Sequence, residues 1–165
     1  MSLQIRPLDL ESDDEVALGR ALIDEYVTFT ADEMERVTGY ALEPAVIARL
    51  IPDRVDFAGR YRDGAYLLAT VAGSPAGGVG TTRVDDARCE MNRLWLREKY
   101  RGNGLGRSLV QACIEHARAL GFENMVLDVA PYRTGAITLY RSFGFADAPP
   151  VHQYPFEMVP LALEL

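Results

Sequence analysis

The sequence has little cysteine and no long hydrophobic run, and both absences exclude whole classes of protein. Its two cysteines, Cys89 and Cys113, are too few for a disulfide framework, and neither belongs to a CxxC pair or a Cys/His cluster. We therefore expect reduced thiols, a cytoplasmic protein and no metal centre. The N-terminal MSLQIRPLDL lacks the apolar stretch of a secretory signal. No apolar run reaches the roughly 18 residues of a membrane span, so we expect no membrane partner.

Positive charge is also scarce. The chain has 17 Lys and Arg against 24 Asp and Glu, a formal net charge of -7. Nucleic-acid-binding domains usually present a basic face, so this balance argues against general nucleic-acid binding. It is compatible with an amine substrate, although acidity commonly serves solubility alone. The 165 residues, 48% of them hydrophobic, suffice for one domain with its own core, and we expect a single domain over residues 1–165.

The spacing of apolar residues predicts a mixed α/β domain. Ser12, followed by an acidic turn and by Glu15 in capping-box position, favours a helix start there. The turn residues of 73–76 predict a hairpin, and the strand–helix–strand unit over 89–130 predicts a parallel pair. Prolines in the strand-like tail restrict it to an edge position. The expected strands are 3–8, 65–73, 76–84, 89–96, 124–130 and 152–165, and the expected helices are 12–29, 44–51, 104–122 and 134–145.

The stretch RGNGLGR, residues 101–107, places basic residues and glycines at the start of the clearest helix. Over residues 97–107 there are four basic side chains against Glu98 alone. The first turn of a helix offers unpaired N–H groups and partial positive charge, and glycines let a ligand approach the backbone closely. Together these features predict an anion site, most naturally for phosphate.

The loop alone does not identify its ligand. No GxxxxGK[ST] string exists in the chain, so it is not a P-loop. A GxGxxG fingerprint also fails, because its last position is Arg107 when counted from Gly102 and Leu109 when counted from Gly104. A tight turn with surface arginines and no ligand remains the alternative.

The same residues resemble the GNAT superfamily of acyl-CoA N-acyltransferases. The signature [QR]xxGx[GA] of that superfamily reads Arg101 to Gly106 here, and the resemblance continues through the helix, the strand NMVLDV and the motif LYRSFGF. It is dense over residues 90–145 and weak before them. The resemblance implies a mostly antiparallel sheet flanked by helices, with one parallel strand pair splayed around the CoA site. It also implies acetyl-CoA as the co-substrate.

The resemblance assigns donor contacts to two segments. The pyrophosphate would bind the backbone N–H groups of the glycine loop, which follows a bulged strand. The arginines at the two ends of this loop would add positive charge. The pantetheine arm would pair with the bulged strand itself, where a backbone N–H would polarise the thioester carbonyl. Arg133 stands where many members have an asparagine that contacts the donor, so that contact is lost or Arg133 approaches the phosphates. The loop residues are Arg101, Gly102, Asn103, Gly104, Leu105, Gly106 and Arg107, and the strand residues are Leu94, Trp95 and Leu96.

Two residues are predicted to carry the chemistry. Tyr140 matches the family tyrosine near the CoA sulfur and would protonate the leaving thiolate; the alternative is a core tyrosine on an apolar helix face. Glu90 would deprotonate the amine; the alternative is a carboxylate paired with Arg88. Four further side chains, Glu33, Glu35, Asp128 and His152, stay open as candidates, and His116 is expected to be structural.

The predicted activity is direct transfer of an acetyl group from acetyl-CoA to a primary amine of a small molecule or peptide. A non-catalytic acyl-CoA-binding or regulatory module is the first alternative, and a nucleotide-phosphate binder is the second. Residues 30–64 are expected to frame the acceptor cleft, because the recognised segments supply only the donor side. Members of the superfamily often form dimers, and the strand-like tail could take part in such a homodimer.

Overall fold

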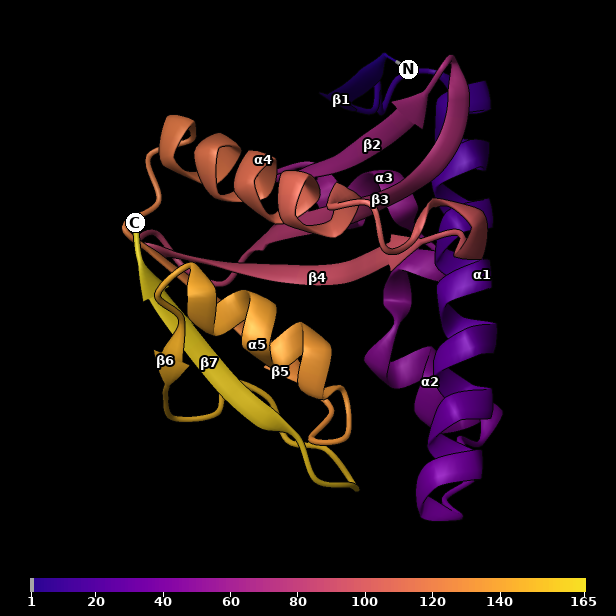
Figure 1. The fold of residues 1–165 in the computed structure, drawn as a ribbon, viewed down its shortest axis with the longest axis vertical. Helices are drawn as coiled ribbons and strands as arrows, with labels where there is room; N and C mark the ends of the chain where they lie inside the picture. Colours follow the sequence, from indigo (N-terminus) through magenta and orange to yellow (C-terminus); the bar gives the residue numbers. More distant parts are fainter. Residues whose placement is uncertain (1) are drawn as a thin grey trace.

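The computed structural model describes residues 2–165, and its centre is a seven-stranded sheet in the order β1-β2-β3-β4-β5-β7-β6 (Figure 1). All neighbouring strands are antiparallel except β4 and β5, which form the predicted parallel pair. This confirms the predicted fold class. The strands are β1 (Leu3–Pro7), β2 (Ala65–Val71), β3 (Ser74–Arg83), β4 (Arg88–Leu96), β5 (Asn124–Val129), β6 (Ala146–Asp147) and β7 (Val159–Glu164).

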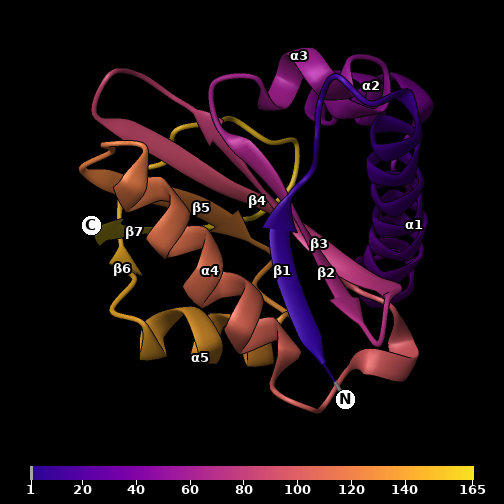
Figure 2. The ribbon, with the colours of Figure 1, turned by 90° about the horizontal axis from the view of Figure 1, so that it is seen from above.

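Helices cover both faces of the sheet. The view in Figure 2 places α4 and α5 on one face and α1, α2 and α3 on the other. Each group of helices packs against one face of the sheet and covers a separate hydrophobic core. The helices are α1 (Asp13–Thr38), α2 (Pro44–Leu50), α3 (Phe57–Tyr61), α4 (Leu105–Ala119) and α5 (Thr134–Ser142), with single 3-10 turns η1 (Pro52–Arg54) and η2 (Glu98–Tyr100).

Strand β2 shows how one sheet contributes to two cores. Its side chains alternate between faces, as the pleat requires. Leu67 and Ala69 pack into the core beneath α4, whereas Tyr66 and Leu68 pack into the core beneath α1 and α3. Both sets are buried, so β2 reads in sequence as a continuous apolar run.

The first helix is longer than the sequence predicts. It continues beyond residue 29 to Thr38, with Met34 still buried on this added stretch, and it ends at Gly39 with φ 76°. At its start, the Ser12 hydroxyl accepts from the Glu15 N–H, as predicted. The Glu15 carboxylate does not complete the capping box, because it binds Arg6 instead.

Two further boundaries differ from the prediction. The β2–β3 hairpin turns on Ala72 and Gly73, one residue earlier than expected, and both have the positive φ of a two-residue hairpin turn. In the tail, only Val159–Glu164 forms a strand, and residues 152–158 are irregular. This strand lies between β5 and the two-residue β6, so the predicted edge position is wrong.

Candidate active site

The parallel strands β4 and β5 part soon after they begin. They pair only over residues 88–90 of β4 and 124–126 of β5. In Figure 1, β4 crosses the molecule while β7, the neighbour of β5, lies at an angle to it, so the two strands separate with distance from the C-terminus. A cavity of about 800 Å³ fills the space between the strands and reaches α1 and α5. This is the splayed pair that the resemblance predicts.

A bulge in β4 forms part of the cavity wall. Gly80 of β3 pairs with Asn92 and Gly78 pairs with Trp95, so β4 contains one extra residue between these points. Arg93 lies in the bulge with φ 54°, an uncommon value for a residue other than glycine. Its guanidinium reaches the fully buried carboxylate of Asp53, with Nε 2.9 Å from Oδ2. This buried ion pair fixes the bulge to the segment that follows α2.

The opposite end of β4 carries a polar face. Glu90 and Asn92 are two residues apart, so they lie on the same face of the strand, and both are buried. The Asn92 amide donates to Glu90 Oε1 at 3.3 Å, and its oxygen accepts from the Tyr61 hydroxyl at 3.1 Å. A Cβ at Gly80 would lie 2.4 Å from Asn92 Oδ1, so glycine at this position makes room for the network. Glu90 is therefore held in one orientation.

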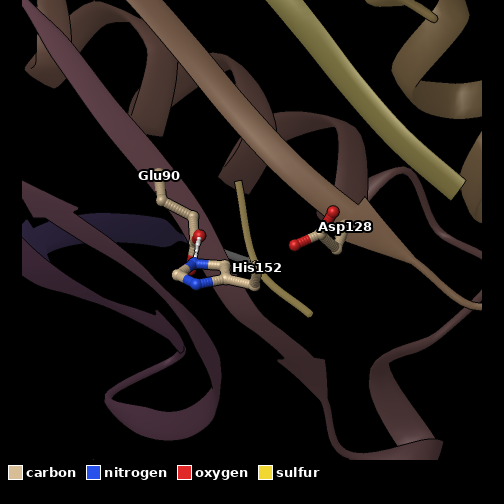
Figure 3. A group of neighbouring side chains, drawn as sticks. All are labelled: Glu90, Asp128 and His152. Atoms are coloured by element: carbon tan, nitrogen blue, oxygen red, sulfur yellow. Dashed lines mark hydrogen bonds and ion pairs between the residues drawn. The ribbon is translucent and has the colours of Figure 1, made fainter. Parts of the chain in front are cut away.

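Three titratable side chains meet beside this strand (Figure 3). Glu90 comes from β4, Asp128 from β5 and His152 from the loop before β7. His152 Nε2 contacts the Glu90 carboxylate, and the Tyr154 hydroxyl donates to Asp128 at 2.9 Å. One ligand atom from each of the three lies within 4.8 Å of the others, a spacing that could also hold a divalent cation. Arg88, the partner considered for Glu90 in the alternative interpretation, pairs instead with Asp85 in the turn before the strand, with a nitrogen–oxygen distance of 2.7 Å.

The surroundings shift the pKa values of these groups in opposite directions. Burial favours the protonated form of Glu90, but the hydrogen bond and positive charge of His152 outweigh it and lower the Glu90 pKa. The hydrogen bond to Glu90 raises the pKa of His152. Burial raises the pKa of Asp128. A carboxylate in contact with an imidazole on a cavity wall can accept a proton from a bound amine and pass it towards solvent.

Tyr140 lies both in the core and on the cavity wall, and its role as an acid stays a prediction. It belongs to the core beneath α4, where its ring packs edge-on against Phe145 at 5.9 Å. It also lines the cavity between β4 and β5. Burial raises the pKa of its phenol, so the hydroxyl keeps its proton at neutral pH and is available as a donor.

The glycine loop presents free backbone N–H groups. Gly102 and Gly104 have φ near +80°, and Gly104 stands directly before α4 without a side-chain cap. None of the N–H groups of residues 102–107 donates to a backbone carbonyl of residues 2–165. These free N–H groups form the positive end of the α4 helix, and they make the loop suitable for binding an anion.

The two loop arginines hold the loop in place. Arg101 lies 4.7 Å above the Trp95 ring and donates to the Leu96 carbonyl at 2.8 Å. Arg107 lies over the Phe143 ring and donates to the Ser142 hydroxyl at 2.6 Å. Both side chains are partly engaged in these contacts, so the free donors at the loop are its backbone N–H groups, and the arginines place positive charge around them.

The guanidinium of Arg133 is also engaged in hydrogen bonds to neighbouring side chains. Its Nε lies 2.7 Å from Glu33 Oε1, and one of its terminal nitrogens lies 3.0 Å from Thr30 Oγ1, which joins the start of α5 to α1. Its predicted contact with the donor stays a prediction.

Most of the predicted site residues lie around one cavity. Asn103, Gly104, Leu105 and Arg107 belong to the adjoining loop and helix start rather than to the wall. The wall also includes part of the 30–64 segment, as expected. The predicted residues on the wall are Glu90, Leu94, Trp95, Leu96, Arg101, Gly102, Gly106, Arg133 and Tyr140, and those from the segment are Thr30, Glu33, Met34, Leu42, Leu50 and Ile51.

Sequence reasoning missed the partners that orient the carboxylates. Asn92 holds Glu90, and Tyr154 holds Asp128. The alternation along β4 could have revealed Asn92, since it shares a face with Glu90. No local signal connects Tyr154 to Asp128, because their contact depends on the path of an irregular loop.

Comparisons with known proteins agree with this geometry. The model of the acetyltransferase (GNAT) family matches residues 32–145, more than half of the chain. The chain belongs to this family. It is 39% identical over 92 residues to an uncharacterized N-acetyltransferase of Schizosaccharomyces pombe, a match that covers 56% of this chain and 52% of that protein. It is 28% identical over 144 residues to an IAA acetyltransferase of Azospirillum brasilense, covering 87% and 86% of the two chains. The chain thus spans about half the length of the first relative.

Solved structures of GNAT proteins share the fold. An acetyltransferase from Streptococcus agalactiae superposes with a TM-score of 0.76 at 18% identity, covering 99% of this chain and 98% of that one. A GNAT family acetyltransferase from Elizabethkingia anophelis, solved with acetyl-CoA bound, gives 0.62 at 17% identity, covering 99% and 98%. Within residues 2–165, none of the helices combines the length and apolar character needed to cross a bilayer.

Proposed function

We propose that this GNAT protein transfers an acetyl group from acetyl-CoA directly to a primary amine. The observation that carries the proposal is the single cavity between β4 and β5. It joins the glycine loop at one end to the buried Glu90 carboxylate, which contacts His152, and Tyr140 lies on its wall. Binding both substrates in one cavity would align the amine with the thioester, and orientation alone can supply a large part of the rate gain.

The donor side would be built from the loop and the bulged strand. Free N–H groups of residues 102–107 would accept the pyrophosphate, and Arg101 and Arg107 would add charge. Beyond Glu90, the outer edge of β4 has no strand partner in residues 2–165, so Leu94 to Leu96 can pair with an extended pantetheine arm. A backbone N–H of this edge would polarise the thioester carbonyl.

The acceptor side would use Glu90 and His152 as the base. Amines are mostly protonated at neutral pH and must lose a proton before they attack. Glu90 would take that proton, and His152, which contacts the same carboxylate, would carry it towards solvent when its imidazole is neutral. The free amine would then attack the carbonyl carbon, forming the C–N bond and placing negative charge on the oxygen. Collapse of this intermediate breaks the C–S bond, Tyr140 would give its proton to the departing thiolate, and the extra proton left on the new amide nitrogen would return to the Tyr140 phenolate.

The test is a thiol-release assay with purified protein, acetyl-CoA and a panel of primary amines. We expect acetyl-CoA-dependent release of free CoA that requires an amine, and CoA binding by isothermal titration. Tyr140→Phe should lower kcat by about 10- to 100-fold with little change in CoA affinity, since general acid catalysis contributes at least this much. The matched control is Tyr100→Phe, outside the cavity wall, which should keep the wild-type rate.

Other outcomes would decide against parts of the proposal. No CoA binding would reject the donor assignment, and ATP competing with CoA equally well would favour a nucleotide site. CoA binding without transfer to any amine would favour the non-catalytic module. We further propose that no metal takes part, so dialysis against a chelator should leave the rate unchanged. The buried, unbridged thiols of Cys89 and Cys113 support a reducing compartment such as the cytoplasm.

A further inference from the structure

A second, smaller cavity of about 290 Å³ adjoins the first beside Glu90. The two cavities share Glu90, Arg93, Leu50 and Tyr154 as lining residues. Three of its nine lining residues are arginines and a fourth is a histidine, in a protein whose net charge is negative. Its titratable lining residues are Arg49, Arg60, Arg93 and His152, with Glu90 as the carboxylate and Tyr154 as a phenol.

The three arginines differ in how far their charges are already used. Arg93 is fully engaged, with two bonds to the buried Asp53 carboxylate and one to the Leu50 carbonyl. Arg60 has only a long ion pair, with its Nε 3.9 Å from Asp53 Oδ1, beyond hydrogen-bond distance. Arg49 is exposed at the cavity rim and has no ion pair among the residues that the structure describes.

The Arg60 Nε is the unexplained group in this cavity. It is buried and donates to no acceptor in residues 2–165. A buried donor without a partner is costly, and a charged acceptor is the partner that satisfies a guanidinium best. Its charge also reaches the active-site pair, because it lowers the pKa of His152 against the stronger effect of Glu90. The cavity is therefore suited to an anionic group next to the base.

The larger cavity adds an apolar wall on the acceptor side. Met34, Leu42, Ile51, Phe156 and Met158 line it between α1 and the loop before β7. A ligand whose amine contacts Glu90 could place an apolar group here and an anionic group against Arg60.

We propose that the acceptor is an apolar α-amino acid with a free carboxylate, which binds Arg60 and Arg49 in the second cavity. An α-amino acid carries its amine and carboxylate on the same carbon, so the two groups can meet Glu90 and Arg60 in adjoining cavities. This proposal rests on the proposed function and names its substrate class. The same subsite would disfavour the N-terminal and lysine amines of peptides, which lack a free carboxylate on the carbon that carries the amine.

The experiment compares acceptors that differ in one group. Leucine, methionine and phenylalanine are assayed beside the amines that lack their carboxylate, beside their amides, and beside aminophosphonates of the same side chain. We expect kcat/KM for the amino acids to exceed that for the amines and amides by about 10- to 100-fold, since a charge-assisted contact is worth this much. Aminophosphonates that work better than the amino acids would assign the subsite to phosphonate-like anions instead and overturn the carboxylate assignment.

Variants test which residue makes the contact. Arg60→Gln should raise KM for the amino acid at least about 10-fold while leaving kcat/KM for the matching amine nearly unchanged. Arg60→Lys should restore part of the loss. Arg62→Gln, an exposed position just after the same helix, is the matched control and should behave as wild type. Arg49→Gln provides a second variant on an exposed side chain, so a folding defect in the Arg60 variant would not leave the proposal untested.

The outcomes separate this inference from the function on which it rests. Acetylation of amines and amino acids at equal rates, or an equal loss for both in Arg60→Gln, would overturn the carboxylate subsite while the acetyltransferase activity stands. Absence of thiol release with every acceptor would instead reject the transferase itself. Amino acids acetylated selectively, with the selectivity lost in Arg60→Gln, would support both.

Discussion

The side chain of His152 contacts the Glu90 carboxylate and so joins the loop before β7 to the middle of the sheet. The two groups stabilise each other's charged forms, since the His152 pKa is raised above 6.5 and the Glu90 pKa is lowered below 4.5. The histidine contribution is present below its unfolded pKa and is lost as pH rises through the raised folded value. The glutamate contribution is present above its unfolded pKa and is lost as pH falls through the lowered folded value.

The pair therefore predicts a pH-dependent stability difference. His152→Gln should lower the free energy of unfolding more at about pH 5.5 than at about pH 9, because only the lower pH keeps both charges. Urea denaturation at the two pH values measures this. In a Glu90→Gln background, the same histidine replacement should lose most of its pH dependence. An equal effect at both pH values in the wild-type background would contradict the charge pairing.

The loop conformation makes a prediction about Gly104. Its φ of 80° is unfavourable for other residues, whereas an added Cβ would meet nothing within 4 Å. Gly104→Ala should therefore cost about 1 kcal/mol of unfolding free energy from backbone strain alone, without a clash. It should also weaken CoA binding by moving the loop N–H groups.

Gly135→Ala is the matched control for that measurement. Gly135 lies in α5, and a Cβ there also meets nothing within 4 Å, so alanine should stabilise the helix slightly. Urea denaturation that gives the same loss for both variants would reject the role assigned to φ at Gly104.

The contact between Arg133 and Glu33 predicts an energetic coupling between α5 and α1. A double-mutant cycle with Arg133→Met and Glu33→Gln should give a coupling energy of about 0.5–3 kcal/mol, because both side chains are largely buried. Additive effects on unfolding would contradict it. Titration of CoA into Arg133→Met then tests the predicted donor contact, since a purely structural arginine would leave the affinity unchanged.

Trp95 gives a direct optical signal for ligand binding. It is the only tryptophan in the chain, lines the cavity and lies under the Arg101 guanidinium. Binding of CoA at the loop should shift Arg101 and change the emission of this indole. A fluorescence titration measures the change, and calorimetry on Trp95→Phe should still detect binding. An unchanged emission at saturating CoA would place the ligand elsewhere.

The donor side of the site could be predicted from the sequence because it is local. The glycine loop, the bulged strand and Tyr140 lie within about 50 consecutive residues, and their spacing follows from one strand–helix–strand unit. The loop's positive φ values follow from its glycines. Local patterns thus determine most of this wall.

The acceptor side could not be predicted in the same way. His152 contacts Glu90 although 62 positions separate them in the sequence, and the segment before β7 that carries His152 is irregular. Asp53 pairs with Arg93 across 40 positions. Such contacts depend on how loops pack against the finished sheet. The extra turns of α1 were missed for a similar reason, since only tertiary burial of Met34 distinguishes them from a polar linker.

The parting of β4 from β5 leaves an open strand edge in the middle of the sheet, where folded proteins normally pair every backbone group. A molecule that lies along this edge completes the sheet and binds only the folded chain. Its free energy of binding then adds to that of folding, by about 2.7 kcal/mol at a concentration 100 times its dissociation constant. The lifetime of the protein against cellular proteases should accordingly follow the supply of its donor metabolite and shorten when that supply runs low.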